Sequence, residues 1–515
     1  MTTIRAIRPI AIAVLTALVV ASAAAQERYD DPHGRYTTAI PSGWSTSATP
    51  DVLTLERTDP DAVMHVLAPI GSEMDVVAAA LAILIDPSLD ADFAVTPLQA
   101  SPAALPSGTW TQRIYQVGDD IVAAISLERA DYTVLVLAQA SQAAFMQAVN
   151  AATNEILLGL EVLIDDPTAD EPSDLPYDVI ETTFTSDDAT LAGTLTLPHG
   201  DGPHPGLVVV SGSGAQDRDG MNPAMPGYRP LLWLADHLTR HGFAVLRFDE
   251  RGVAASTGDH EAATTADLAD DVAAGLRHLA AADRVDGARV GLLGHSEGSV
   301  IVGRVAAEHS DEVAFVVAMA GSAVPYAELA ITQVERIAAA SGASPTEIAE
   351  AVAQQREVVE LALAEDWAQL EARLVAIFTE QIEALPEDQR ARLGDAEALI
   401  AQQAAASVAA FQSPWLSFFF DYDPRDDLRQ ITVPVLVLFG ELDVQVDVEQ
   451  NRGPFEAALA AAGNDDVSVV VFPHANHLFQ EAVTGGPEEY LALEMAFLPG
   501  FLDTISDWLS ERFLP

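Results

Sequence analysis

Three residues far apart in the chain have the side chains that nucleophilic catalysis needs. Ser296 lies in "GLLGHSEGSV" (291–300), Asp443 in "GELD" and His477 in "PHANHLFQ". A serine hydroxyl is a weak nucleophile unless a histidine takes its proton and an acid orients that histidine. The three residue types therefore predict attack on a carbonyl group, provided the fold brings them together.

The surroundings of Ser296 favour that function. An apolar strand pattern, "ARVGLLG" (288–294), precedes it, the five residues around it read G-x-S-x-G, and a helical pattern follows. Strand, G-x-S-x-G and helix in this order predict a tight turn that exposes the hydroxyl above a sheet. Gly294 and Gly298 are the elbow glycines, because side chains there would collide with neighbouring elements. His295 is expected to pack or hydrogen-bond locally.

Asp443 and His477 each follow a predicted strand, which is where the sites of open α/β sheets lie. Their order along the chain, Ser then acid then His, is the order expected after such an elbow. His474 remains an alternative base, and Asp447 and Asp423 remain alternative acids.

A tetrahedral intermediate also needs backbone N–H groups directed at its oxyanion. The N–H of Glu297, directly after the nucleophile, is one expected donor. The second is the N–H of Ser213, in the loop "SGSG" that follows the apolar run 206–211.

Six near-continuous apolar runs after residue 177 predict strands that are buried on both faces, as in a parallel sheet. Amphipathic stretches separate them, so we expect an α/β fold with a doubly wound, mostly parallel sheet. Residues 326–412 contain only helical patterns and predict a helical cap inserted into this fold. Trp415, Phe418 and Phe419 follow the cap and either pack it on the core or line a substrate pocket. The six runs are 206–211, 243–248, 288–294, 313–321, 432–440 and 467–472.

The chain upstream divides into three segments. Residues 1–25 resemble a cleavable signal peptide, with two arginines, a short apolar run and an Ala-Ala-Ala cleavage site, so export to the periplasm or the medium is expected. Residues 26–164 show several strand patterns and two helical patterns, of which the second closes the segment at 142–163. They predict a small α+β accessory domain. Residues 165–176, acidic and Pro-rich, predict a linker to a catalytic domain over 177–515.

The composition excludes several classes of partner and chemistry. A formal net charge of −52, with arginine as the only basic residue besides histidine, opposes binding to nucleic acid or to anionic membranes. The absence of cysteine excludes disulfides, thiolate catalysis and cysteine-ligated metals. No segment after the signal is long and apolar enough to span a bilayer, so a protein without stable membrane insertion is expected.

Six stretches together resemble a bacterial exported α/β-hydrolase family of carboxylesterase type, whose members are often labelled serine aminopeptidase-like hydrolases. The resemblance covers about residues 177–515 and departs from the family at Ser299, where a second glycine is common. It implies hydrolysis of a small-molecule carboxylic ester through an acyl-enzyme, without metal or organic cofactor. The alternatives are an aminopeptidase-like, thioesterase or acyltransferase activity on the same residues, or a non-catalytic binding protein. The stretches are "VVVSGSGAQDRDG", "FAVLRFDERGVAASTGD", "GLLGHSEGSV", "SPWLSFFFDYDP", "FGELDVQV" and "NHLFQ".

Overall fold

The part of the chain that the structure describes falls into two compact units, which we call the N-terminal unit and the C-terminal unit. The C-terminal unit comprises residues 176–221 and 228–514. The computed structural model describes residues 28–30, 36–41, 43–49, 52–58, 61–68, 73–85, 99–105, 108–117, 120–128, 133–141, 153, 156, 160–162, 175–221, 228–385, 390 and 396–514.

The N-terminal unit is built on a seven-stranded antiparallel sheet with the strand order β3-β4-β5-β9-β8-β7-β6. Large side chains such as Trp110 and Tyr36 are buried in one core. Helix α1 (Glu73–Ala80) and the short π-helix η1 (Leu81–Ile85) that follows it contribute to a second core. The sheet strands are β3 (Ser45–Ala48), β4 (Val52–Thr58), β5 (Asp61–Leu67), β6 (Gln99–Leu105), β7 (Gly108–Val117), β8 (Asp120–Glu128) and β9 (Thr133–Ser141).

Two details of this unit differ from the sequence prediction. Strand β6 was not expected, because its sequence, QASPAAL, contains a proline and small residues and lacks a β-branched pattern. The predicted helix over 142–163 is wrong at its end, where β10 (Glu161–Val162) pairs with β2 (Tyr36–Ala39). Strand β2 also pairs with β1 (Arg28–Asp30) in the same small sheet.

The C-terminal unit contains an eight-stranded sheet in which β12 alone runs against the others. Each of the six predicted apolar runs overlaps one of the parallel strands β13 to β18, and β17 is buried at every position. In spatial order the strands are β11 (Tyr177–Ser186), β12 (Ala189–Pro198), β14 (Ala244–Phe248), β13 (His204–Val210), β15 (Val285–His295), β16 (Val316–Met319), β17 (Val435–Gly440) and β18 (Val467–Phe472).

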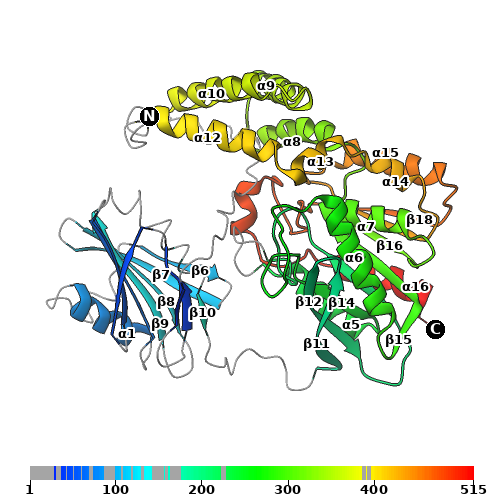
Figure 1. Cartoon of the computed structure of the whole chain (residues 1–515), viewed down its shortest axis with the longest axis horizontal. Coiled ribbons are helices and arrows are strands. Elements are labelled where there is room, and N and C mark those ends of the chain that lie inside the picture. Colours follow the sequence, from blue (N-terminus) through cyan, green and yellow to red (C-terminus); the bar gives the residue numbers. More distant parts are fainter. Residues whose placement is uncertain are drawn as a thin grey trace. The chain divides into compact units, whose positions relative to one another are not determined.

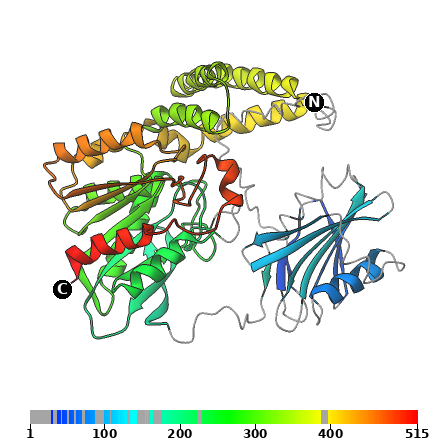
Figure 2. The same cartoon turned by 180° about the vertical axis from the view of Figure 1, so that it is seen from behind.

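Helices cover both faces of this sheet, as Figures 1 and 2 show from opposite sides. One core joins the sheet to α6 (Thr265–Ala280), α7 (Glu297–Glu308) and α15 (Val448–Ala461). The other joins it to α5 (Pro230–Arg240) and α16 (Phe501–Phe513). The doubly wound, mostly parallel α/β sheet predicted from the sequence is thereby confirmed.

The hairpin β11–β12 was absent from the predicted strands. Its first strand is exposed or half-buried over residues 178–183 and carries three threonines, which is typical of an edge strand rather than of a continuous apolar run. Ten residue pairs join β11 to β12, and β12 in turn pairs with β14, so the hairpin extends the sheet beyond the predicted strands.

A cluster of helices forms the predicted cap, which lies beyond one end of the sheet in both views (Figures 1 and 2). Its helix α9 begins with a capping box in which Ser344 and Glu347 exchange hydrogen bonds. Pro345 occupies the first position of the helix. A core of its own, which includes Leu374, Ile377 and Phe420, holds the cap together. The helices within the predicted range are α8 (Tyr326–Ala340), α9 (Pro345–Leu363), α10 (Trp367–Ala384) and α12 (Ala396–Phe411). The next helix, α13 (Pro414–Asp421), lies beyond that range but shares the same core, so the cap extends to include it.

The signal peptide predicted over 1–25 lies outside the described residues, as does most of the linker predicted over 165–176. Among the helices of the described ranges, none combines the length and the apolar character that crossing a bilayer requires.

Candidate active site

Ser296 occupies a strained turn between β15 and α7. Its backbone has φ 56° and ψ −120°, in a region that non-glycine residues rarely adopt, and it precedes the first residue of α7. Its N–H donates to the carbonyl oxygen of Met319 on the neighbouring strand β16, at 2.8 Å. The strained residue is therefore fixed to the sheet at the position where the sequence predicted a nucleophile elbow.

The two predicted elbow glycines allow backbone segments to approach each other closely. A Cβ atom on Gly294 would lie 2.1 Å from the carbonyl oxygen of Gly298. A Cβ atom on Gly298 would lie 2.3 Å from the carbonyl oxygen of Ser211. Both positions thus require glycine, because any side chain would force the turn apart.

Ser299 is the position at which the sequence departs from the family that it resembles. Its hydroxyl is shared between the carbonyl oxygens of Gly294 and Met319, at 2.6 and 2.9 Å. Gly321 leaves room for it, since a Cβ atom there would lie only 2.5 Å from the Ser299 Cβ. Ser299 therefore ties α7 to the sheet and leaves the elbow intact.

His477 and Asp443 lie together at the ends of neighbouring strands. His477 follows β18, Asp443 follows β17, and Nδ1 of the imidazole is 2.9 Å from Oδ2 of the carboxylate. The other carboxylate oxygen accepts from the N–H groups of Gln445 and Val446, each at 2.8 Å. Both side chains are nearly inaccessible to solvent, with 6% and 0% exposed. This arrangement leaves Nε2 of His477 available as a base.

The alternative residues have other partners. Asp447 caps α15 and pairs with Arg336, and Asp423 caps the short helix α14 (Pro424–Leu428) and pairs with Arg425. His474 is exposed, and its backbone N–H donates to the carboxylate of Glu441. The geometry thus brings together Asp443 and His477 and not the other candidates.

His295, beside the nucleophile, holds the histidine loop in place. Its Nε2–H donates to the backbone oxygen of His477 at 2.9 Å, and the two rings lie 4.9 Å apart. Burial, aided by the nearby charge of a protonated His477, lowers the pKa of His295 to about 4. His295 is therefore neutral at pH 7. Within the described chain no hydrogen bond joins Ser296 Oγ to His477; such bonds often tighten only when substrate binds.

The loop after β13, which carries Ser213, runs beside the nucleophile. A Cβ atom on Gly212 would lie 3.1 Å from the Ser296 Cβ. The side chain of Gln216 donates to the carbonyl oxygens of Gly212 and Ser213, at 3.0 and 3.2 Å. Glu250 accepts from the hydroxyl of the preceding Ser211 and from the Gln216 N–H. This bonding keeps the backbone of the predicted oxyanion loop in one position.

An ion pair joins the motifs "QDRDG" (216–220) and "DERG" (249–252), and a second ion pair ties "DERG" to α6. The guanidinium of Arg218 makes two hydrogen bonds to Asp249, at 3.0 and 2.8 Å, and the backbone N–H of Arg218 also donates to it. Arg251 pairs with Asp271 on α6 through two bonds of 2.7 Å. These contacts make the two motifs supports of the loops around the site, as expected from their charged residues.

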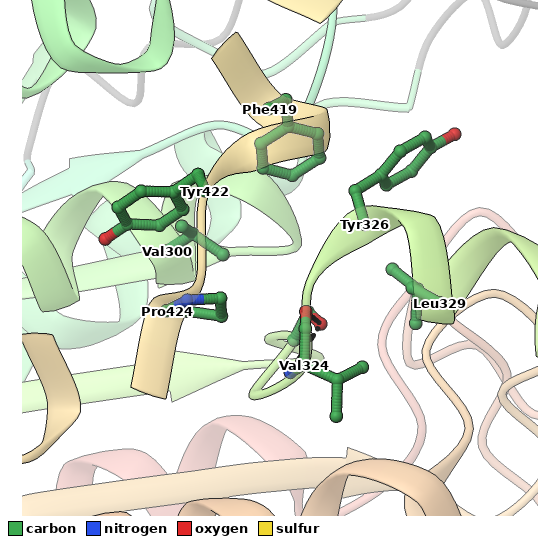
Figure 3. A pocket seen from close by; sticks show the side chains of 8 residues that line it. Val300, Val324, Tyr326, Leu329, Phe419, Tyr422 and Pro424 are labelled. Atoms are coloured by element: carbon green, nitrogen blue, oxygen red, sulfur yellow. Dashed lines mark hydrogen bonds between the residues drawn. The ribbon is translucent and has the colours of Figure 1, made fainter. Parts of the chain in front are cut away.

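The three predicted pocket residues on α13 have different positions. Trp415 and Phe419 stack with their ring centroids 5.9 Å apart, and Phe419 lines a small apolar hollow of about 10 Å³. Phe418 instead stacks on Tyr422 and faces the guanidinium of Arg304, outside that lining. Figure 3 shows Phe419 directed into the hollow from α13 and Tyr326 standing on α8 opposite. The full lining is Val300, Ser322, Val324, Tyr326, Leu329, Phe419, Tyr422 and Pro424.

Residues 220–482, about half of the chain, match the family described as alpha/beta hydrolase fold. The chain belongs to this family. The match includes Ser296, Asp443 and His477 and the whole cap, and it agrees with the topology of the sheet.

Among curated proteins, the chain is similar to Esterase EstD of Thermotoga maritima, with 25% identity over 311 residues. The alignment covers 59% of this chain and 62% of the relative, so it spans less than two thirds of that protein's length.

Two solved structures are also similar. An esterase of Pyrococcus furiosus has 17% identity and a TM-score of 0.39, with 67% of this chain and 95% of that chain covered. A proline iminopeptidase of Mycobacterium smegmatis has 17% identity and a TM-score of 0.38, with coverage of 64% and 98%.

Proposed function

We propose that the protein is a serine hydrolase that cleaves carboxylic esters of small molecules through an acyl-enzyme intermediate. The observation that carries the proposal is the buried His477–Asp443 hydrogen bond of 2.9 Å, at the same edge of the sheet as the strained elbow of Ser296. The family match supports hydrolysis, and the name of the Thermotoga relative favours an ester over other acyl substrates.

The mechanism follows from these positions. Nε2 of His477 removes the proton from Ser296, and Oγ attacks the carbonyl carbon of the ester. The oxyanion accepts hydrogen bonds from the N–H groups of Ser213 and Glu297. When the intermediate collapses, His477 protonates the leaving alkoxide; it then activates water, which releases the acid and restores Ser296. Asp443 holds the imidazole with Nδ1 protonated and stabilises the imidazolium.

The test is a panel of p-nitrophenyl esters of increasing acyl length, with aminoacyl p-nitroanilides run in parallel. The wild type should hydrolyse esters, and Ser296→Ala should lose at least about 10⁴-fold in kcat. Ser310→Ala, an exposed serine just beyond the far end of α7, is the matched control and should behave like the wild type. Ester turnover that survives in Ser296→Ala contradicts the mechanism, and turnover of anilides alone contradicts the substrate class.

A further inference from the structure

A second buried carboxylate lies beside the nucleophile, and the proposed reaction uses only its backbone. Glu297 is the first residue of α7, and only 4% of it is exposed. Its side chain accepts hydrogen bonds from two other elements, α6 and α13. A buried carboxylate is costly unless it accepts hydrogen bonds, so the identity of its partners shows what it holds together.

Two of its hydrogen-bond partners come from the core and from the cap, and a third, the Ser213 side chain, comes from the predicted oxyanion loop. Thr265 Oγ1, at the start of α6, donates to Glu297 Oε1 at 2.8 Å. The indole Nε1–H of Trp415, on α13, donates to the same oxygen at 2.8 Å. Thr265 is fully buried, so the carboxylate is anchored to the core on one side and reaches the cap on the other.

The electrostatics agree with a carboxylate that is held rather than solvated. Burial raises the pKa of Glu297, and the hydrogen bonds from Trp415 and Thr265 oppose that rise. The side chain of Ser213, in the predicted oxyanion loop, also favours the ionised form.

Trp415 connects this carboxylate to the apolar hollow. Its ring stacks on Phe419 with an interplanar angle of 17°, and the Phe419 ring lies 5.0 Å from that of Tyr326. Phe419 and Tyr326 both line the hollow (Figure 3). A shift of Trp415 away from Glu297 would therefore move the wall of the hollow that lies against α7.

We propose that the Glu297 side chain is a positioning residue that fixes the cap helix α13, and with it the Phe419 wall of the apolar hollow, against the nucleophile elbow. The residue acts as a hydrogen-bond acceptor through Oε1. Its carboxylate touches no reacting atom in this scheme. The expected change in kcat/KM rests on the proposed ester hydrolysis. The expected loosening of α13 rests on the contacts alone.

The kinetic test compares Glu297→Ala, Glu297→Gln and Trp415→Phe. Glutamine keeps an acceptor oxygen, so its kcat/KM should stay within about threefold of the wild type, whereas alanine should lose about 30-fold and Trp415→Phe about tenfold. Trp415 and Glu297 are expected to act through the single hydrogen bond between them. The double variant Glu297→Ala with Trp415→Phe should therefore have the same kcat/KM as Glu297→Ala alone. Trp508→Phe is the matched control, since its indole N–H donates to Ser468 on β18 and not to the site.

A second measurement does not depend on turnover. Hydrogen–deuterium exchange of the amides of α13 in the full chain should speed up in Glu297→Ala and Trp415→Phe, and stay unchanged in Glu297→Gln and Trp508→Phe. Unchanged exchange in all four variants overturns the inference, as do additive kinetic effects or a glutamine variant as impaired as alanine. If the wild type hydrolyses no ester, the proposed function fails, while the exchange data still decide the role of Glu297.

Discussion

Two buried acids flank the elbow serine, and their surroundings are built in opposite ways. Asp443 accepts two backbone N–H groups from residues two and three positions further along its own turn, and one bond from His477. Glu297 accepts from side chains 32 and 118 residues away, on a core helix and a cap helix. One acid is supported locally, and the other depends on the completed tertiary structure.

This difference in support matches the different roles proposed for the two acids: Asp443 acts in the proton transfer, and Glu297 positions the cap. The local turn orients the acid that the proton transfer needs, so its geometry does not depend on the cap. The Glu297 carboxylate links the core helix α6 to the cap helix α13, whose relative position the proposed reaction depends on. Removing charge from one acid and from the other should therefore have very different consequences.

The largest expected effect comes from Asp443→Asn set against Glu297→Gln. The new amide at 443 would direct an N–H at Nδ1 of His477 and favour the tautomer in which Nε2 carries the proton, so kcat should fall about 10³- to 10⁴-fold. Glu297→Gln should stay within about threefold, because its acceptor oxygen remains. Steady-state kinetics on one ester measures both; equal losses would erase the distinction between the two acids.

The second effect concerns how tightly the elbow is packed. Gly298→Ala would place a Cβ atom 2.3 Å from the Ser211 oxygen and should lower the free energy of unfolding by about 3 kcal/mol or more. Gly303→Ala on the same helix meets its nearest neighbour at 3.8 Å and should stabilise the protein by up to about 1 kcal/mol. Urea unfolding of the full-length variants compares them. A tolerated alanine at 298 would show that the elbow is less constrained than its contacts indicate.

The smallest effect is a pH dependence of stability caused by His295. Its pKa is about 4 in the folded protein and near 6.5 in the unfolded chain, so the unfolded state binds more protons as pH falls from 6.5 to 4. Stability is therefore lost over this window, by about 2 kcal/mol at pH 5 relative to pH 7.5. His295→Gln should lack this part of the loss. Parallel urea titrations at both pH values test it, and identical losses in variant and wild type would refute it.

The local half of the site could be predicted from the sequence. Ser296, Asp443 and His477 each follow an apolar run, and the C-terminal ends of parallel strands meet at one edge of the sheet. The glycines at 294 and 298 mark the tight turn for the same reason, because only a missing Cβ permits the contacts found there. The α/β fold was predicted from the six apolar runs, and the cap from the uninterrupted helical patterns over 326–412.

The long-range half could not be predicted. Nothing in the sequence around Trp415 indicates that its indole reaches Glu297, since helix patterns do not fix the packing of a cap on a core. Phe418 and Phe419 are adjacent and chemically identical, and only the register of α13 decides that Phe419 alone of the two lines the hollow. The hairpin β11–β12 was missed because β11 is a largely exposed edge strand, and because threonines and a glycine interrupt the apolar residues of the buried β12.

The central claim, that Ser296 is the nucleophile activated by His477 and Asp443, is tested most directly by covalent labelling with a fluorophosphonate. Peptide mass spectrometry of the labelled full-length protein should find one adduct, on the peptide containing Ser296. The adduct should be absent in Ser296→Ala and should form far more slowly in Asp443→Asn. An adduct on another residue, or label retained by Ser296→Ala, would contradict the account.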